Sequence, residues 1–379
     1  MSRPAPRGWC PSAERPMLSG DGLIVRLRPP LGRIEAGAFL ALCTAAEWYG
    51  NGILEVTSRA SLQLRGVSEA GHAALLDDVA AEGLLGDTPQ NGAGITVHPF
   101  WQPGDNTAAL TDQIATALAQ LPALPAKFGV VLDHGPARVL TDISADIRVE
   151  RDIEGGLVVR ADGAPTGCSC AAESVAQTAA ALARWFLETG GAEQRRMRRH
   201  LAETPLPASF QGTPPAPARA AGIGPSPLGP VIGIPFGQST AAEMRQLVET
   251  MAPAALRLTP WRAVLLEGAA ATAPPPGFIA EPSDPLRRIE ACPGAPACPA
   301  ATVATRPLAR HLSGRFPGRV HVSGCSKGCA WPRSAEHVLV GRDGAFDLVL
   351  SGTAWDTPTR QSLTPEEAVA LAGAKLGDA

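Results

Sequence analysis

The sequence of 379 residues lacks features that would each define a class of protein. Its formal net charge is −3, so it has no excess of positive charge with which to bind nucleic acid. No apolar run approaches the roughly 20 residues that a membrane-spanning helix needs. The opening stretch MSRPAPRGWCPSAERP also lacks the hydrophobic core of a signal peptide. These absences predict a cytoplasmic protein with no nucleic-acid partner and no membrane partner.

A Gly-rich dinucleotide-binding fingerprint is missing as well, because no such motif follows a predicted strand. An enzyme with this sequence would therefore not hold a reduced pyridine nucleotide itself. We expect it to take electrons from an external electron donor or reductase.

Cysteine is scarce but concentrated near the C-terminus. Of eight cysteines, Cys292 and Cys298 are separated by five residues, and Cys325 and Cys329 by three, in loops containing Gly or Pro. In a reducing cytosol, clustered cysteines are typical of metal, cluster or redox sites rather than disulfides. Four thiolates brought together by turns can ligate a 4Fe-4S cluster. Zinc is the main rival, although its cysteine pairs usually enclose two to four residues, so we predict the 4Fe-4S cluster.

The remaining cysteines do not show the spacing of a metal or cluster site. Cys43 lies with Phe39, Leu42 and Ala46 on one apolar face of a predicted helix, which indicates a core residue. Cys168 and Cys170 in PTGCSCAA are too close in sequence for an easy shared tetrahedral site, so we interpret them as structural. Cys10 in RGWCP receives no assignment.

The chain contains one unit used twice. GLIVRLRPP, AGAFLALCTAAEW and GILEVTSRASLQLRG predict strand, helix and strand, and so do PVIGIPFGQ, AAEMRQLVETMA and ALRLTPWRAVLLEG. Thr57 corresponds to Thr259 and Gly66 to Gly268 at a constant offset. A second pair of segments, SADIRVERDIEGGLVVRADG and SAEHVLVGRDGAFDLVLSG, predicts two hairpins that turn at Gly. The sequence therefore predicts an α+β protein made of two related halves.

The halves divide further into small and large units in alternation. Pro-rich stretches, which favour extended surface chain, separate the units. The predicted order is a small unit over 16–82, a large unit over 88–203, a linker over 204–226, a small unit over 227–282 and a cysteine-bearing large unit over 286–375.

The cysteine pattern resembles the cluster motif of the sirohaem-type sulfite and nitrite reductases, which are built from the same doubled unit. EVTSRASLQLRG looks like their first anion- and tetrapyrrole-contacting strand, and LPAKFG like their lysine loop. RGWCPSAERPMLSGDGLIVRLRP, NGILEVTSRASLQLRGV, ACPGAPACPAA and VSGCSKGCAWP are together more similar to the oxygen-using branch of that superfamily, which acts in aerobic cobalamin (vitamin B12) synthesis. The resemblance covers nearly the whole chain. It implies two ferredoxin-like half-domains and two larger α/β subdomains related by pseudo-twofold symmetry.

The resemblance implies a monooxygenase that uses dioxygen to convert precorrin-3A to precorrin-3B by hydroxylation and lactone formation. The alternative is a sirohaem-dependent sulfite or nitrite reductase, and a third hypothesis is an electron carrier or tetrapyrrole-binding protein without chemistry. Two departures disfavour the reductase. Gly129 stands where those enzymes have a second lysine, and no arginine lies near Ala93, so half of the positive charge needed over a haem iron is missing. Sirohaem is thus the less expected cofactor.

Candidate substrate-binding residues follow from the chemistry of a precorrin. Its acetate and propionate groups call for several cations, with arginine favoured for two-point pairing. Strand alternation places Arg26 and Arg28 on one face, where they can act together. Arg59 and Arg65 lie in the strand that resembles the tetrapyrrole-contacting one, and Lys127 precedes the apolar strand FGVVL. We predict that these five residues bind the substrate.

The resemblance also implies a mononuclear non-haem iron that activates dioxygen. Such iron commonly uses two histidines and one carboxylate. His98, and His134 beside Asp133, are the candidates, with Asp142 and Asp146 in the same unit. The alternative is that His134 and Asp133 form an ordinary surface pair.

Overall fold

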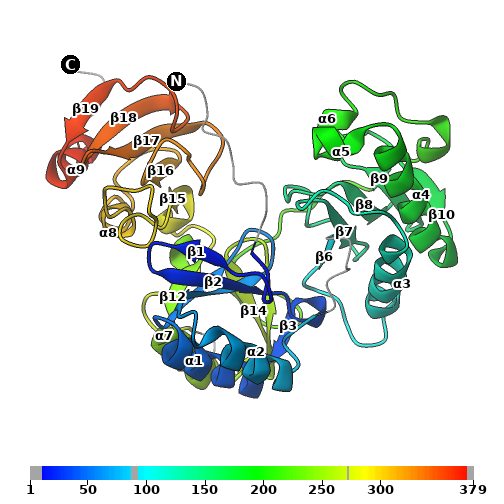
Figure 1. Ribbon diagram of the computed structural model, residues 1–379, viewed down its shortest axis with the longest axis horizontal. Coiled ribbons are helices and arrows are strands. Elements are labelled where there is room, and N and C mark those ends of the chain that lie inside the picture. Colours follow the sequence, from blue (N-terminus) through cyan, green and yellow to red (C-terminus); the bar gives the residue numbers. More distant parts are fainter. Residues whose placement is uncertain (1–10, 87–92, 271–272, 374–379) are drawn as a thin grey trace.

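The computed structural model describes residues 11–86, 93–270 and 273–373. Cys10, the predicted start of the first large unit at residue 88 and the predicted end of the second at residue 375 lie outside these ranges. Figure 1 shows two small sheets side by side above a row of helices, with the two larger units standing over them. Within the described residues no helix has the length and apolar character needed to cross a membrane.

The first small unit begins with a strand hairpin and continues into a helix. Leu23, Val25 and Leu27 alternate inward along the second strand, as the sequence predicts, and Phe39 and Cys43 are buried on the first helix. Its elements are β1 (Met17–Ser19), β2 (Gly22–Leu27), α1 (Ala36–Tyr49), β4 (Ile53–Val56), β5 (Leu62–Val67) and α2 (His72–Ala81).

The segment expected to form one closing strand is instead a hairpin, in both halves. In the first half the Thr57 hydroxyl accepts hydrogen bonds from the backbone amides of Arg59 (3.2 Å) and Ser61 (3.3 Å), and Ala60 has φ 48°. This tight turn places Arg59 between β4 and β5, so the prediction that it lies on a strand is wrong. The second half has the same hairpin between β13 (Ala255–Leu258) and β14 (Ala263–Glu267).

The two small sheets exchange strands. Their orders are β1-β2-β5-β4-β12 and β11-β14-β13-β3. β3 (Arg33–Glu35) leaves the first half to pair with β13, and β12 (Gln238–Thr240) leaves the second half to pair with β4. Each half therefore completes the sheet of the other. The second half begins with β11 (Val231–Gly233) and adds α7 (Ala241–Met251), which lies beside α1 under one shared core.

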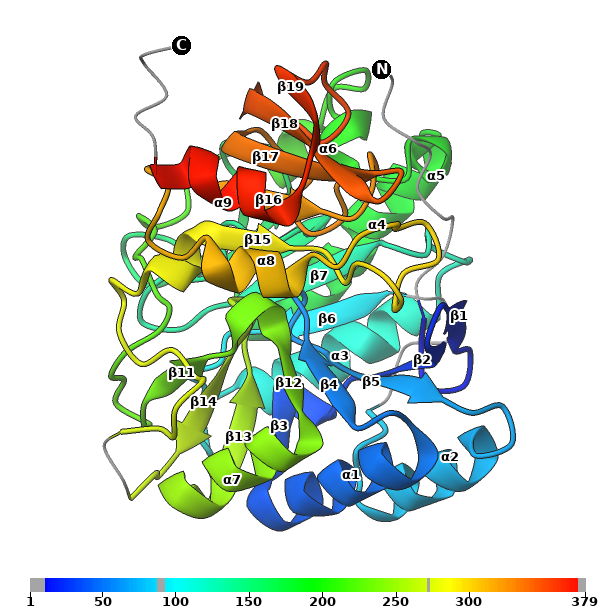
Figure 2. The same ribbon diagram turned by 90° about the vertical axis from the view of Figure 1, so that its left-hand side faces the viewer.

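The two larger units have the same topology, which confirms the duplicated fold (Figure 2). In each, three parallel strands are followed by two antiparallel ones. The first contains β6 (Gly94–Val97), α3 (Thr107–Ala119), β7 (Gly129–Asp133), β8 (Ile147–Arg151), β9 (Leu157–Ala161), β10 (Cys168–Cys170), α4 (Val175–Glu188), α5 (Gly191–Gln194) and α6 (Met197–His200). The second contains β15 (Ile289–Ala291), α8 (Arg306–His311), β16 (Val320–Ser323), β17 (Ala335–Arg342), β18 (Ala345–Gly352), β19 (Arg360–Leu363) and α9 (Pro365–Gly373).

The Pro-rich segment that follows the first larger unit remains attached to it. Backbone hydrogen bonds tie Thr213 to Gly167 (2.9 Å) and Ala216 to Arg151 (2.7 Å). The segment contains only one short 3-10 turn, at Ala208–Phe210, because its prolines cannot continue a helix.

Candidate functional site: a cationic cavity and a cysteine loop pair

A cavity of about 740 Å³ opens between the first small unit and the first larger unit. The turn that carries Arg59, strand β6, the N-terminal end of β7 and helix α3 form its walls. Arg28, Arg59 and Lys127 line it, whereas Asp112 is the single acidic residue among its described lining. The cavity therefore has a net positive lining.

Two of these three cations have no partner within the described part of the chain. Arg59 and Lys127 are half-buried, and no hydrogen bond or ion pair engages either side chain. The Arg28 guanidinium lies against β6, where a methyl group on Gly94 would come within 2.9 Å of its Nη1. Uncompensated cations in a half-enclosed cavity favour an anionic ligand because they gain charge-assisted hydrogen bonds on binding.

The other two predicted substrate cations lie elsewhere. Arg26 is half-buried on β2 and donates to Gln63 Oε1 (2.8 Å). Arg65 is buried, with its side chain 2% exposed, and makes a two-point ion pair with Asp21 at 2.9 and 2.8 Å. The structure thus brings Arg28, Arg59 and Lys127 together in one cavity and leaves Arg26 and Arg65 out of it.

The four clustered cysteines lie on two loops at one edge of the second larger sheet. Cys292 is buried directly after β15, and Cys325 and Cys329 follow β16, which runs parallel to it. Burial, and then the electrostatic influence of Cys292, Cys325 and Cys298, raise the pKa of Cys329 to about 11. Burial also raises the pKa of Cys325, with further contributions from Cys298 and Cys292. The other three clustered cysteines therefore all contribute to the raised pKa of Cys329.

Glycines give both loops their shape. Gly294 has φ 72° and Gly328 has φ 59°, a region that side-chain-bearing residues rarely adopt. A methyl group on Gly294 would lie 2.7 Å from Thr305 Oγ1. The Cys298 amide donates to the Gly294 carbonyl (2.8 Å), and the Ser323 hydroxyl donates to the Cys325 carbonyl (2.7 Å).

Cys292 has two polar neighbours that were not predicted from the sequence. Its Sγ lies 3.7 Å from His321 Nε2 and 3.4 Å from Ser323 Oγ, and the Ala330 amide donates to it at 3.4 Å. Burial lowers the pKa of His321 to about 4, so the imidazole is neutral at physiological pH. The available signal was strand alternation: His321 and Ser323 are two residues apart on the strand that leads to Cys325.

His98 and His134 come together at the ends of β6 and β7. Their rings meet edge to face with centroids 5.3 Å apart, and His98 Nε2 and His134 Nδ1 have no hydrogen-bond partner among the residues that the structure describes. Burial, followed by the neighbouring His134, lowers the pKa of His98 to about 4, and burial also lowers the pKa of His134. Both imidazoles are therefore neutral near pH 7.

The predicted carboxylates do not join this histidine pair. Asp133 accepts hydrogen bonds from the backbone amides of Val139 and Leu140 (2.9 and 2.8 Å). Asp146 binds Arg196 (2.9 Å), and Asp142 is exposed. Within residues 11–86, 93–270 and 273–373, no three His, Cys, Asp or Glu side chains form a group that could hold a single metal ion.

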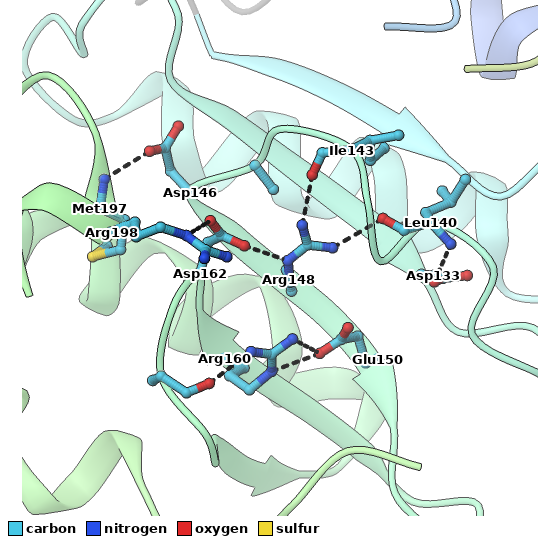
Figure 3. Close-up of polar contacts among 12 residues, drawn as sticks. Asp133, Leu140, Ile143, Asp146, Arg148, Glu150, Arg160, Asp162, Met197 and Arg198 are labelled. Carbon is cyan, nitrogen blue, oxygen red and sulfur yellow. Dashed lines mark hydrogen bonds and ion pairs between the residues drawn. The ribbon is translucent and has the colours of Figure 1, made fainter. Parts of the chain in front are cut away.

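A buried ionic network shapes the loop over residues 134–146, which forms part of the cavity wall (Figure 3). Arg148 on β8 pairs with Asp162 (2.6 Å) and donates to the carbonyls of Leu140 (3.0 Å) and Ile143 (2.6 Å). Glu150 accepts from Arg160 at 2.7 Å. Because Ile143 lines the cavity, the network fixes one side of the site.

Cys43 and Cys170 serve packing. Cys43 is fully buried in the core shared by the two small sheets, where burial raises the pKa of its thiol to about 12. Cys170 is partly buried against the core of the first larger unit. Cys168, on the same edge strand, is only half-buried.

Replacing Cys43 by alanine should cost only modest packing energy. We expect a loss of about 1 kcal/mol in the free energy of unfolding, because the change removes one buried sulfur atom. Urea denaturation measures the loss. Iron and sulfide content equal to that of the wild type would confirm that this cysteine is separate from the clustered ones.

Comparisons with known proteins agree with this fold. The nitrite/sulfite reductase ferredoxin-like half domain matches residues 15–82. The fold is similar to that of the Mycobacterium tuberculosis NirA protein, with a TM-score of 0.64 and 16% identity over 92% of this chain and 79% of that one. Fold and half-domain together define a protein of the nitrite/sulfite-reductase-like class.

A sequence relative narrows that class. A precorrin-3B synthase of Sinorhizobium sp is 32% identical over an alignment of 408 residues, which covers 98% of this chain and 88% of that protein. The chain belongs to the precorrin-3B synthase family, whose members are oxidoreductases.

Proposed function

We propose that the protein is an oxygen-dependent monooxygenase of aerobic cobalamin biosynthesis that converts precorrin-3A to precorrin-3B by hydroxylation and lactone formation. One oxygen atom of dioxygen enters the macrocycle. The other leaves as water, with two electrons from an external donor and two protons. The observation that supports this function is the cationic cavity, in which Arg59 and Lys127 have no partner among the described residues, in a chain of the precorrin-3B synthase family.

The cavity has the chemistry that a polycarboxylate tetrapyrrole needs. Its volume of about 740 Å³ falls within the range of roughly 300 to 1,000 Å³ typical of small-molecule sites. We assign Arg28 and Arg59 to substrate carboxylates because a planar guanidinium binds a carboxylate at two points. Lys127 adds a point charge beside them. Ile95 and Val97 on β6 supply apolar wall for the ring system.

We further propose that Cys292, Cys298, Cys325 and Cys329 hold a 4Fe-4S cluster, which would supply electrons to the reaction. Each thiol comes from a glycine-containing loop, and the other three cysteines contribute to the raised pKa of Cys329. In such a cluster each thiolate binds a different iron atom, so the four sulfurs need not converge on one point. A single zinc ion would require that convergence, which the described cysteines do not show.

A mononuclear iron with two histidines and one carboxylate does not fit the described residues. His98 and His134 offer free ring nitrogens, but Asp133 and Asp146 are committed to loop amides and to Arg196. We assign no step of the reaction to such an iron.

Incubation of the purified protein with precorrin-3A, dioxygen and a reductant tests the proposed function. We expect a product that has gained one oxygen atom, detected by mass spectrometry, and no product without dioxygen. A strong haem absorption band together with sulfite or nitrite reduction would support the reductase alternative instead. Binding of precorrin-3A without turnover would identify a tetrapyrrole carrier.

Arg59→Lys is expected to weaken precorrin-3A binding by roughly 1 to 3 kcal/mol, because lysine keeps the charge but loses the two-point contact. Binding is measured under anaerobic conditions, so that turnover does not interfere. Trp261→Phe is the matched control. Trp261 occupies the equivalent position in the second half and stacks on Phe100 at 6.0 Å, so its variant should bind almost normally. Equal affinity of wild type and Arg59→Lys would remove Arg59 from the site.

A further inference from the structure

Arg65 connects the first small unit to the cysteine-bearing unit. Besides its pair with Asp21, its guanidinium lies 3.4 Å from Glu55 and donates through Nη2 to the carbonyl of Ala297 (2.9 Å). Ala297 immediately precedes Cys298. Arg65 is therefore directed at the backbone of the first cysteine loop, from 232 residues away in sequence.

The Ala297 carbonyl is the main contact between the first cysteine loop and the first small unit. It also accepts hydrogen bonds from Ser19 Oγ (2.7 Å) and from the Gly20 amide (3.3 Å), so three donors from the first small unit meet at one oxygen. The approach is so close that a methyl group on Gly20 would lie 2.3 Å from the Pro296 carbonyl oxygen. The loop between Cys292 and Cys298 thus rests directly on the β1–β2 hairpin.

The second half contains an equivalent ion pair between the same two strands, with the positions of the acidic and basic residues exchanged. Where the first half has Glu55 on β4 and Arg65 on β5, the second has Arg257 on β13 and Glu267 on β14, paired at 2.8 Å. Arg257 also donates to backbone carbonyls of the other larger unit, at Pro99 (3.1 Å) and Trp101. Each small sheet therefore clamps a loop that belongs to the other half. The first small sheet clamps the loop after β15, and the second clamps the loop after β6. Only the clamp at Arg65 holds a loop that carries cysteines.

We propose that Arg65 is a positioning residue for the cluster: it fixes the Ala297 carbonyl, and through it the Cys298 sulfur, from the other half of the chain. This inference rests on the proposed 4Fe-4S site. Residues that orient a metal ligand without touching the metal typically change metal affinity by about 10- to 100-fold when mutated. A lysine at position 65 cannot bind Asp21 at two points and reach Ala297 at the same time.

The test compares Arg65→Lys with Arg257→Lys, which weakens the equivalent clamp on the loop without cysteines. Iron and sulfide content, the EPR spectrum and midpoint potential of the reduced cluster, and hydrogen exchange over residues 293–304 are measured on each protein as purified. We expect Arg65→Lys to release iron to a chelator about 10- to 100-fold faster than wild type, with a changed EPR spectrum and faster exchange over 293–304. Arg257→Lys should instead speed exchange near Trp101 and leave the cluster spectrum unchanged.

Ser19→Ala removes one donor to the same carbonyl and is a milder variant in case Arg65→Lys fails to fold. It should shift iron release and local exchange in the same direction by a smaller factor. An Arg65→Lys protein with normal cluster properties and weaker precorrin-3A binding would overturn the inference and restore Arg65 as a substrate anchor. Absence of iron and sulfide from the wild type would overturn the proposed cluster instead, while hydrogen exchange would still report on the clamp.

Discussion

Cys298→Ser is expected to abolish the iron–sulfur cluster, and Cys325→Ser should do the same. A cubane site that lacks one thiolate loses iron readily, and the harder hydroxyl oxygen is a poor replacement ligand for iron in this setting. The two residues come from different loops, after β15 and after β16, so parallel losses would show that both loops serve one centre. Iron and acid-labile sulfide content, with the visible absorption of the purified proteins, measure the effect.

The controls for this experiment lie in the same chain. Cys43→Ala should retain full iron and sulfide, because Cys43 belongs to the core of the small sheets. Unchanged iron and sulfide in both serine variants would contradict the cluster assignment. Zinc at one ion per wild-type chain, without sulfide, would replace the cluster by a structural zinc site.

Arg148→Met should lower the free energy of unfolding by about 3 to 5 kcal/mol, because it leaves Asp162 buried without its main partner and deprives two loop carbonyls of their donor. The loop that borders the cavity loses its support, so precorrin-3A affinity should fall as well. Denaturation in urea and anaerobic substrate binding measure the two effects.

Arg198→Met is the matched control for that variant. Arg198 also pairs with Asp162, at 3.3 Å, but its side chain is 72% exposed, so its loss should cost about 1 kcal/mol or less. Equal destabilisation by the two variants would show that burial does not determine how much Arg148 contributes to the free energy of unfolding.

Local signals in the sequence were sufficient to predict the repeats and the two loops that carry the clustered cysteines. Spacing alone predicts that Cys292 and Cys298 belong together, and the parallel strands bring Cys325 and Cys329 to the same sheet edge. Alternation likewise predicts the buried residues of β2 and α1. Such patterns depend on residues a few positions apart, which is why one sequence suffices to find them.

The role of each arginine could not be predicted in the same way. Arg59 and Arg65 lie six residues apart in one motif, yet Arg59 faces the cavity while Arg65 is buried against Asp21 and Ala297. That difference depends on a turn at Ala60 and on partners 44 and 232 residues away from Arg65. His321 was missed for a similar reason, since its contact with Cys292 spans two strands.

The exchange of β3 and β12 sets a condition on how the chain folds during its synthesis. While only the first half has left the ribosome, β4 is an unpaired edge and β3 has no sheet to join, because its partner β13 ends at Leu258. The first small sheet is incomplete until β12 has emerged, and the second until the β13–β14 hairpin has emerged. The unpaired β4 edge is a site for aggregation during that interval. If the chain is cut within the linker, each fragment lacks the strand that the other fragment supplies to its small sheet. The two fragments should therefore become soluble only when they are produced together.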